Sequence, residues 1–327
     1  MAQAVIISVD ALGGDNAPDV VLEGVRAALE ADKDLAVILC GPDEVVTPFA
    51  AEVDRCEARA TTEVVTMAEH PANAVRKKKD SSLVVGCRLV KDGVADGFFS
   101  AGSTGACLAA GTLVIGRIKG IARPALATVV PSPIKPTVLT DVGANADCKP
   151  EYLVQFAQMG AIYARKMLGV EEPRIGLLNI GEEETKGSQF AQDVHAFLRE
   201  QVPGFDGNAE GRDVIAGEFD VIVSDGFTGN VCLKTIEGTA KVLFSEIKSI
   251  MKKSAITKLG ALTMKGGLYD LKAKIDPDAL GGAPLLGVKG ACIVGHGSSN
   301  ARAVKNGILT AASIVRENVA GLIAETV

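Results

Sequence analysis

Residues 5–15 read VIISVDALGGD, an apolar, β-branched run that ends in two glycines between two aspartates. This order predicts a buried strand, then a turn and a helix, which is the repeating unit of an open parallel sheet. Five more glycine-rich turns follow similar runs, namely SAGSTGA (100–106), DVGAN (141–145), NIGEEETKG (179–187), SDGFTGN (224–230) and GHGSSN (295–300). Because such turns and the helix N-termini behind them offer backbone N–H groups, they predict a long anion-binding crevice at the carboxyl edge of the sheet.

Strand-like and helix-like segments alternate along almost the whole chain of 327 residues. The alternation predicts an α/β fold with a mostly parallel sheet and helices on both faces. We expect one domain over residues 1–327, built as a single unit or as two intimate lobes that share strands. The expected strands include 4–9, 35–40, 63–66, 95–99, 174–179, 219–224 and 290–294, and the expected helices include 18–31, 82–92, 150–168 and 299–318.

Composition and charge exclude several classes of protein. With 47% apolar and 23% charged residues the chain is globular, and its net charge of −6 argues against general binding of nucleic acid. No apolar run approaches the roughly 20 residues that span a bilayer, and no basic flank precedes the first apolar stretch, so we expect a cytoplasmic protein. The seven cysteines are spread singly without metal-ligand spacing, so we expect reduced thiols and no metal site.

Residues 248–274 carry seven lysines and a single aspartate, a local net charge of +6 on an otherwise acidic chain. Met251, Leu259 and Leu262 recur at helical spacing and form an apolar stripe beside these lysines. Gly266 and Gly267 are expected to break the segment into an amphipathic helical hairpin over 248–276. Two interpretations stay open: a surface that meets anionic lipid or an acidic partner, and a lid or dimerisation hairpin that packs on a second subunit.

The turns contain many anion donors but no evident nucleophile. They match neither the Walker A sequence, nor the GxGxxG dinucleotide fingerprint, nor the GxSxG elbow of serine hydrolases. Lys186 can hold phosphate as a point charge, or it pairs with one of the three glutamates before it. Asn230 can donate to a developing oxyanion, and His296 is the one histidine in a glycine turn. This chemistry indicates that a bound phosphate is itself the reactant and attacks an activated acyl group.

Taken together, the motifs DALGGD, RKKKDSS, SAGSTGA, DVGANAD, NIGEEETKG, GFTGNVCLK and GGAPLLGVKG followed by HGSS resemble the PlsX family of phosphate acyltransferases. The resemblance covers essentially the whole chain, although Leu12 and Ser103 stand where the family usually has Met and Asn. It implies transfer of a long-chain fatty acyl group from acyl-[acyl carrier protein] to orthophosphate, which gives acyl phosphate for bacterial phospholipid synthesis. It also implies an isocitrate/isopropylmalate dehydrogenase-like sheet, a homodimer without nicotinamide or another cofactor, and peripheral association with membrane.

The resemblance and the chemistry of the turns together select the candidate site residues. The catalytic candidates are Lys186, Asn230 and His296, with Asp10 and Asp225 orienting the site. The candidates for binding phosphate or substrate are Gly13, Gly14, Asp15, Ser103, Thr104, Gly105, Asn145, Gly297 and Ser298. For docking of the acidic carrier protein we expect Arg76, Lys77, Lys78 and Lys79, and for contact with membrane Met251, Leu259 and Leu262. A membrane glycerol-3-phosphate acyltransferase is a further expected partner, because it would take over the labile acyl phosphate.

Three other functions stay open from the sequence. A phosphotransacylase that uses acyl-coenzyme A needs similar turns, and the preferred thioester donor would separate it from the first interpretation. A metal-dependent hydroxy-acid dehydrogenase shares the fold, but it needs an aspartate metal cluster that the sequence does not show. A non-catalytic membrane scaffold would bind lipid through residues 248–274 and would release no carrier protein from its thioester.

Overall fold

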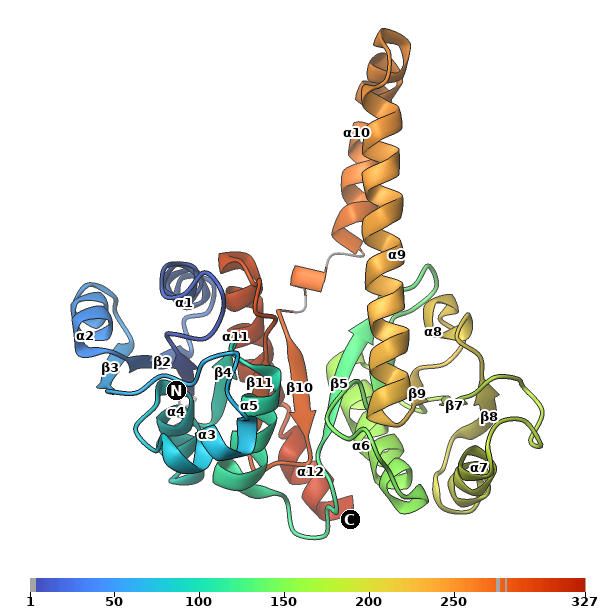
Figure 1. Cartoon of the computed structure of the whole chain (residues 1–327), viewed down its shortest axis with the longest axis horizontal. Helices are drawn as coiled ribbons and strands as arrows, with labels where there is room; N and C mark the ends of the chain where they lie inside the picture. Colours follow the sequence, from blue (N-terminus) through green and yellow to red (C-terminus); the bar gives the residue numbers. More distant parts are fainter. Residues whose placement is uncertain (1–3, 275–276, 280, 327) are drawn as a thin grey trace.

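The computed structural model describes residues 4–274, 277–279 and 281–326, and it folds them around an eleven-stranded sheet (Figure 1). The strands lie in the order β3-β2-β1-β4-β11-β10-β5-β6-β9-β7-β8. Neighbouring strands run parallel except at β10 and β5, which are antiparallel to each other and to their neighbours β11 and β6. The expected α/β fold with a mostly parallel sheet is confirmed. The bounds are β1 Val5–Asp10, β2 Leu35–Gly41, β3 Cys56–Ala60, β4 Gly97–Ser100, β5 Ala125–Val130, β6 Thr137–Thr140, β7 Ile175–Leu178, β8 Phe205–Ala209, β9 Val221–Val223, β10 Ala283–Leu286 and β11 Ala291–Val294.

Helices cover both faces of the sheet, and adjacent residues of β4 show how. Phe98 packs in one hydrophobic core with α4 and α5, whereas Phe99 packs in the other core with α1 and α11, and both rings are fully buried. The helices are α1 Asp19–Ala31, α2 Asp43–Glu52, α3 Pro71–Lys77, α4 Ser82–Lys91, α5 Thr104–Ala110, α6 Pro150–Leu168, α7 Gln189–Gln201, α8 Asp213–Ala216, α9 Gly226–Lys252, α10 Ala255–Lys274, α11 Ala301–Arg316 and α12 Val319–Thr326, with a π-helical turn η1 at Gly111–Gly116 and a 3-10 turn η2 at Pro277–Ala279.

The predicted bounds of some of these elements agree with the structure, and those of others do not. The helix expected at 150–168 is α6, with Pro150 in its first turn and Gly169 after its last turn at a φ of 71°. The strand expected near 63–66 is wrong, because β3 lies at Cys56–Ala60 instead. Within the expected range only Glu63 pairs, through an isolated parallel bridge to Ser81, while Thr62 before it donates its N–H to the carboxylate of Asp80 at 3.0 Å. The backbone here is tied to residues 80–81 and not to a strand of the sheet.

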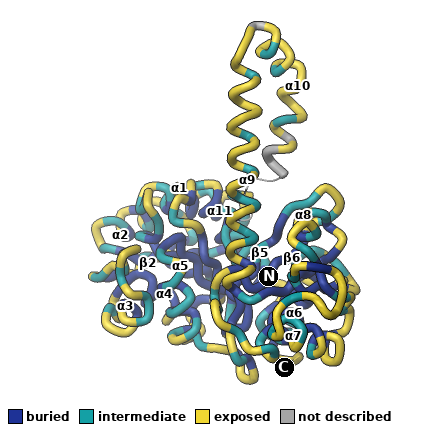
Figure 2. The backbone as a smooth tube through the Cα atoms, turned by 45° about the vertical axis from the view of Figure 1, so that its right-hand side comes forward, coloured by how far each residue is buried: buried dark blue, intermediate teal, exposed yellow. Residues whose placement is uncertain are grey.

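The helices α9 and α10 lie side by side and project from the body of the protein (Figure 1, Figure 2). Gly266 and Gly267 do not break the segment, since both lie inside α10. The chain reverses instead at residues 253–254, where the backbone N–H groups and hydroxyls of Ser254 and Thr257 bond reciprocally and cap α10. Residues 275 and 276, the last two of the expected hairpin, lie outside the described residues.

Most residues of the projecting pair are exposed (Figure 2). Leu259 and Leu262 on α10 are 66% and 67% exposed, and Ile256 is 84% exposed. Met251, near the end of α9, is half-buried. Apolar residues of this size are normally covered in a monomeric protein, so a contiguous set of them indicates a surface that meets something else.

Candidate functional site

Three of the expected turns, those after β1, β4 and β11, meet in one group. Asp15 donates its N–H to the carbonyl of Gly297 at 2.7 Å, which joins the first turn to the last. A Cβ on Gly13 would lie 2.6 Å from Ser100 Oγ, so only glycine lets the first turn approach the second this closely. The parallel pairing of β1, β4 and β11 brings their carboxyl ends to the same edge. We call residues 10–15, 100–106 and 295–299 the N-terminal cluster.

Asp10 holds the N-terminal cluster together from inside. The hydroxyl of Ser100 donates to its buried carboxylate at 2.8 Å, and the N–H of Leu12 donates at 3.1 Å. The Ser100 hydroxyl oxygen in turn accepts the N–H of Gly102 at 3.0 Å. Burial raises the pKa of Asp10 above its usual value and outweighs the opposing effect of its hydrogen bonds. The carboxylate therefore links the first turn to the second.

His296 lies exposed in the turn after β11 and belongs to a local network. Its Nδ1 lies 2.8 Å from Ser298 Oγ and accepts the N–H of Ser298 at 3.3 Å. Because Nδ1 accepts a hydrogen bond, the neutral ring carries its proton on Nε2.

The turn after β4 supplies the start of a helix. Ser103 takes the N-cap position of α5, and its side chain makes no capping hydrogen bond. Thr104 is exposed, whereas a Cβ on Gly105 would lie 2.6 Å from the ring of Pro71, so α3 packs closely on this turn. The first N–H groups of a helix have no partner within that helix, and here they add to the donors of the N-terminal cluster.

The turns after β6 and β9 form a second group. Three antiparallel pairings separate β11 from β6, so β6 and β9 run opposite to β4 and β11, and the expected crevice along a single carboxyl edge is wrong. Gly226 donates its N–H to the carbonyl of Asn145 at 2.8 Å. A Cβ on Gly229 would lie 2.0 Å from the carbonyl oxygen of Asp141, a distance that no side chain tolerates. The two glycines of SDGFTGN therefore let the first turn of α9 press against residues 141–145. We call residues 141–145 and 224–230 the C-terminal cluster.

Asp141 is the organising residue of the C-terminal cluster, and it was not among the sequence candidates. Its buried carboxylate accepts backbone N–H groups of Leu126, Gly143, Ala144 and Asn145 and the side-chain amide of Asn145. Burial raises the pKa of Asp141 in spite of these bonds. The available signal was an aspartate directly after a strand and two residues before a glycine.

The two candidate asparagines differ in what their amides contact. The side-chain nitrogen of Asn145 donates to Asp141 Oδ2 at 2.9 Å and to the carbonyl of Pro124 at 2.8 Å, so both of its hydrogens are used inside the protein. Asn230 is exposed in the first turn of α9, and its amide has no hydrogen-bond partner among the residues that the structure describes. Asp225 caps this turn by accepting a backbone N–H at 2.9 Å. Asn230 is thus the available donor, and Asn145 supports the turn.

Lys186 lies in a third turn, after β7, that keeps its own contacts. Glu182 pairs with Arg212 at 2.9 Å, and Glu184 pairs with Arg199. Glu183 Oε2 lies 4.0 Å from the ammonium group of Lys186, at the outer limit of an ion pair. No hydrogen bond or ion pair within the described ranges joins this turn to either cluster. The expected pairing of the lysine with a neighbouring glutamate is weak, and the side chain of Lys186 is 49% exposed.

Comparison of the sequence with known proteins shows the family of this chain. The family model described as "Fatty acid synthesis protein" matches residues 5–322. This chain belongs to that family. The phosphate acyltransferase of Desulfitobacterium hafniense (strain Y51) is 50% identical over 313 residues, which are 94% of this chain and 93% of that one. The phosphate acyltransferase of Clostridium perfringens (strain SM101 / Type A) is 46% identical over 98% of this chain and 96% of its own. The resemblance to PlsX phosphate acyltransferases is confirmed.

Solved structures of other proteins share the fold of this chain. A phosphotransacetylase from Streptococcus pyogenes superimposes with a TM-score of 0.61 at 18% identity, over 97% of this chain and 95% of that one. A branched-chain phosphotransacylase from Enterococcus faecalis V583 gives a TM-score of 0.59 at 16% identity, over 95% and 99%. At such identities the likeness shows a common fold and nothing more.

The basic segment at the end of α3 is only partly available in this family member. Arg76, Lys77 and Lys79 are exposed. The ammonium group of Lys78 instead donates to Glu69 at 2.7 Å and to the carbonyl of Val64 at 2.6 Å. The hydrogen bond from Lys78, with those from Thr66, lowers the pKa of Glu69 to about 2. Lys78 is therefore left out of the docking residues that we propose below.

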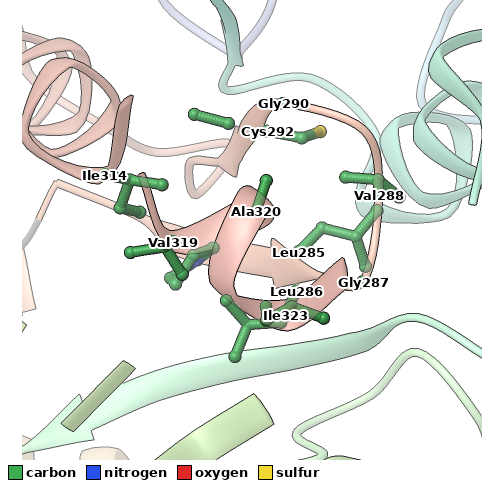
Figure 3. A pocket seen from close by; sticks show the side chains of 12 residues that line it. Leu285, Leu286, Gly287, Val288, Gly290, Cys292, Ile314, Val319, Ala320 and Ile323 are labelled. Carbon is green, nitrogen blue, oxygen red and sulfur yellow. The ribbon is translucent and has the colours of Figure 1, made fainter. Parts of the chain in front are cut away.

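Two cavities differ in size and chemistry. The first lies among apolar side chains of β10, β11 and α12, including Leu285, Val319 and Ile323, and its volume of about 10 Å³ has room for a single water (Figure 3). The second is an open cleft of about 480 Å³ that is lined by Thr112, Leu113, Arg117, Ala122, Arg123 and Tyr152. Only the second is large enough for a part of a substrate.

The described residues contain neither a cluster of metal ligands nor a single helix that could span a membrane. Within residues 4–274, 277–279 and 281–326, no group of three His, Cys, Asp or Glu side chains is placed to hold a metal ion. In the same residues no single helix is long and apolar enough to cross a bilayer, and only the bent pair of α11 and α12 reaches the required length and composition together.

Proposed function

We propose that this protein transfers a long-chain fatty acyl group from acyl-[acyl carrier protein] to orthophosphate and so forms acyl phosphate for phospholipid synthesis. The observation that carries the proposal is the near-full-length similarity, at 45–50% identity, to proteins named phosphate acyltransferase. The geometry supports it, because two clusters of glycine turns offer backbone donors and the amide of Asn230 without an obvious protein nucleophile.

In the proposed reaction a phosphate oxygen attacks the carbonyl carbon of the thioester. The new C–O bond forms and the C–S bond breaks, and the carrier leaves as a thiolate that takes a proton. Backbone N–H groups of residues 103–106 and of Gly297, with Lys186, hold the phosphate, whereas the N–H groups of His296, Ser298 and Ser299 already bond within their turn. Asn230 stabilises the oxyanion, and the protonated ring of His296 gives its proton to the leaving thiolate and regains one from the attacking hydrogen phosphate, while Asp10 and Asp225 orient the turns.

A covalent acyl-cysteine has no place in this mechanism. Burial raises the pKa of Cys107, directly behind the turn after β4, to about 12, and it raises the pKa of Cys292 as well. Both groups are therefore thiols at neutral pH, and the thiol is a poor nucleophile in comparison with the thiolate.

The exposed parts of the chain suggest where partners dock. Arg76, Lys77 and Lys79 would attract the acidic carrier protein. The α9–α10 pair, with Met251, Leu259 and Leu262, would associate peripherally with anionic membrane, beside a glycerol-3-phosphate acyltransferase that takes over the product. The same apolar residues could instead pack in a homodimer, and the two roles are compatible. We also propose that the sheet is of the isocitrate/isopropylmalate dehydrogenase type. The proposed reaction uses no nicotinamide cofactor.

The acyl donor distinguishes this function from its alternatives. We expect phosphate-dependent release of free thiol from acyl-[acyl carrier protein], with much slower release from acyl-coenzyme A. Faster turnover of acyl-coenzyme A would indicate a phosphotransacylase that uses coenzyme A thioesters. Lipid binding without release of thiol from either donor would indicate a scaffold.

A further inference from the structure

The open cleft lined by Arg117, Arg123 and Tyr152 is used by no step of the proposed reaction. One wall is the π-helical turn η1, which continues α5 and carries Thr112 and the half-exposed Leu113. Single π-helical turns are rare, and they occur frequently at functional sites. The opposite wall is the first turn of α6, with Tyr152. The cleft therefore lies between the helix that follows the N-terminal cluster and the helix that follows the C-terminal cluster.

The loop that carries the two arginines is held firmly. Arg117 pairs with Val288 through a β-bridge, and the N–H of Ile118 donates to the carbonyl of Gly287 at 3.0 Å. Gln155 of α6 accepts the N–H of Ala122 at 2.8 Å and donates to the carbonyl of Gly120 at 2.9 Å. The cleft is thus built by hydrogen bonds from both sides.

The charge in the cleft is unbalanced. Arg117 uses one guanidinium nitrogen for the carbonyls of Ile121 and Ala122, which fixes the orientation of the group. Arg123 lines the cleft and makes no hydrogen bond or ion pair with any residue in the described part of the chain. Two arginines and a tyrosine that line one cleft supply the kind of donors that bind a phosphate group.

The position of the cleft indicates which phosphate it would take. Thr112 follows Thr104 by eight residues of helix, so the cleft lies about 12 Å along the helix from the turn that would hold the reacting phosphate. An acyl group on a carrier protein is attached through a pantetheine arm, which has the thioester at one end and a phosphodiester at the other. The separation suits the two ends of this arm better than a single orthophosphate.

We propose that Arg117, Arg123 and Tyr152 bind the phosphate of the phosphopantetheine arm while its thioester reaches the phosphate held by the turn after β4. This inference rests on the proposed function. The direct test compares wild type with Arg123→Gln on acyl-phosphopantetheine and on acyl-pantetheine, which lacks the phosphate. Arg165→Gln is the matched control, because Arg165 is exposed on the same α6 as Tyr152 but about 20 Å further along it.

We expect Arg123→Gln to lower kcat/KM for acyl-phosphopantetheine by about 10- to 100-fold, the usual effect of losing a charged hydrogen bond. Acyl-pantetheine should be used equally well by both proteins, the KM for orthophosphate should not change, and Arg123→Lys should restore part of the activity. An equal loss on both donors, or a raised KM for orthophosphate, would assign the cleft to the reacting phosphate and overturn the proposal. So would unchanged kinetics on every substrate.

Calorimetry with phosphopantetheine and pantetheine separates this inference from the proposed function. Wild type should bind phosphopantetheine more tightly than pantetheine, and Arg123→Gln should remove the difference. If the wild type shows this preference but releases no thiol from acyl-[acyl carrier protein], the cleft proposal stands and the proposed function fails. Equal binding of both probes by the wild type would refute the cleft proposal whatever the activity.

Discussion

Asp10 and Asp141 are buried carboxylates that hold the two clusters of turns, and neither needs to touch a substrate to matter. The sequence predicted Asp10 as an orienting residue because it ends a strand in a glycine turn. Asp141 has the same pattern, but its role depends on backbone groups that only the folded chain brings around it, such as the N–H of Leu126 at 3.0 Å. The same limit applies to Asn145. The sequence offers its amide as a donor to a substrate, but in the folded chain that amide donates to the carbonyl of Pro124.

A pH series on Asp10→Asn tests the buried state of Asp10. Because burial raises its folded pKa above the unfolded value of about 3.9, the native state binds more protons than the unfolded state above that pH. Asp10 therefore lowers the free energy of unfolding progressively as pH rises from about 3.9 through its folded pKa. Relative to wild type, Asp10→Asn should gain stability over that window in chemical denaturation. If the difference in the free energy of unfolding between Asp10→Asn and wild type does not vary with pH, the raised pKa is contradicted.

Substitution of the proposed donors tests the catalytic assignment. Asn230→Ala should lower turnover by about 10²–10³-fold, the typical effect of removing one oxyanion donor, and Asn230→Asp should be as slow because it also lacks the amide. Lys186→Ala should raise the KM for orthophosphate. Lys33→Ala is the control and should leave this KM unchanged, because Lys33 is an exposed lysine more than a hundred residues before the turn of Lys186. Thermal unfolding checks that the variants are folded. Near-normal acyl phosphate formation by Asn230→Ala would refute its role.

At the scale of elements, start and stop signals decided which predictions succeeded. The predicted bounds of α6 are the observed ones, and Pro150 and Gly169 mark its two ends in the structure. The reversal between α9 and α10 lies before the predicted glycines, because Ser254 and Thr257 cap α10 reciprocally at its start. Glycine inside a helix reduces its stability but does not require the helix to end.

Alanine substitution tests the position of that reversal. A Cβ at Gly266 or Gly267 meets nothing within 4 Å, and both residues lie in α10. Gly266→Ala and Gly267→Ala should therefore each stabilise α10 by about 1 kcal/mol. Hydrogen exchange of residues 255–274 measures this as slower opening. If the chain turned at these glycines, the same changes would accelerate exchange.

Charge substitution on α10 tests the membrane role of the exposed stripe. Each leucine contributes about 1.5–3 kcal/mol when fully buried, so changing both Leu259 and Leu262 to Glu should reduce co-sedimentation with anionic vesicles more than tenfold. Ile134→Glu is the control, since Ile134 is 74% exposed elsewhere on the surface. Binding of the wild type should weaken with salt. Unchanged sedimentation of the double variant, with altered mass by light scattering, would favour a dimerisation surface.

At the scale of the whole molecule, the order of the strands explains how distant turns meet. The late strands β10 and β11 enter the middle of the sheet, so β11 lies beside β4 and its turn joins those of the first hundred residues. Alternation along the chain predicted a parallel sheet, but it could not predict this return, because strand order depends on long-range pairing. We propose that the two parallel parts act as lobes of one domain, with β5 and β10 between them.

Formation of acyl phosphate tests the central claim most directly. Wild-type protein is incubated with palmitoyl-[acyl carrier protein] and isotopically labelled orthophosphate, and the products are identified by mass spectrometry while free carrier thiol is titrated. We predict labelled acyl phosphate and free carrier in equal amounts, neither of them without orthophosphate. Release of carrier thiol that is independent of orthophosphate, or the absence of labelled acyl phosphate, would contradict the account.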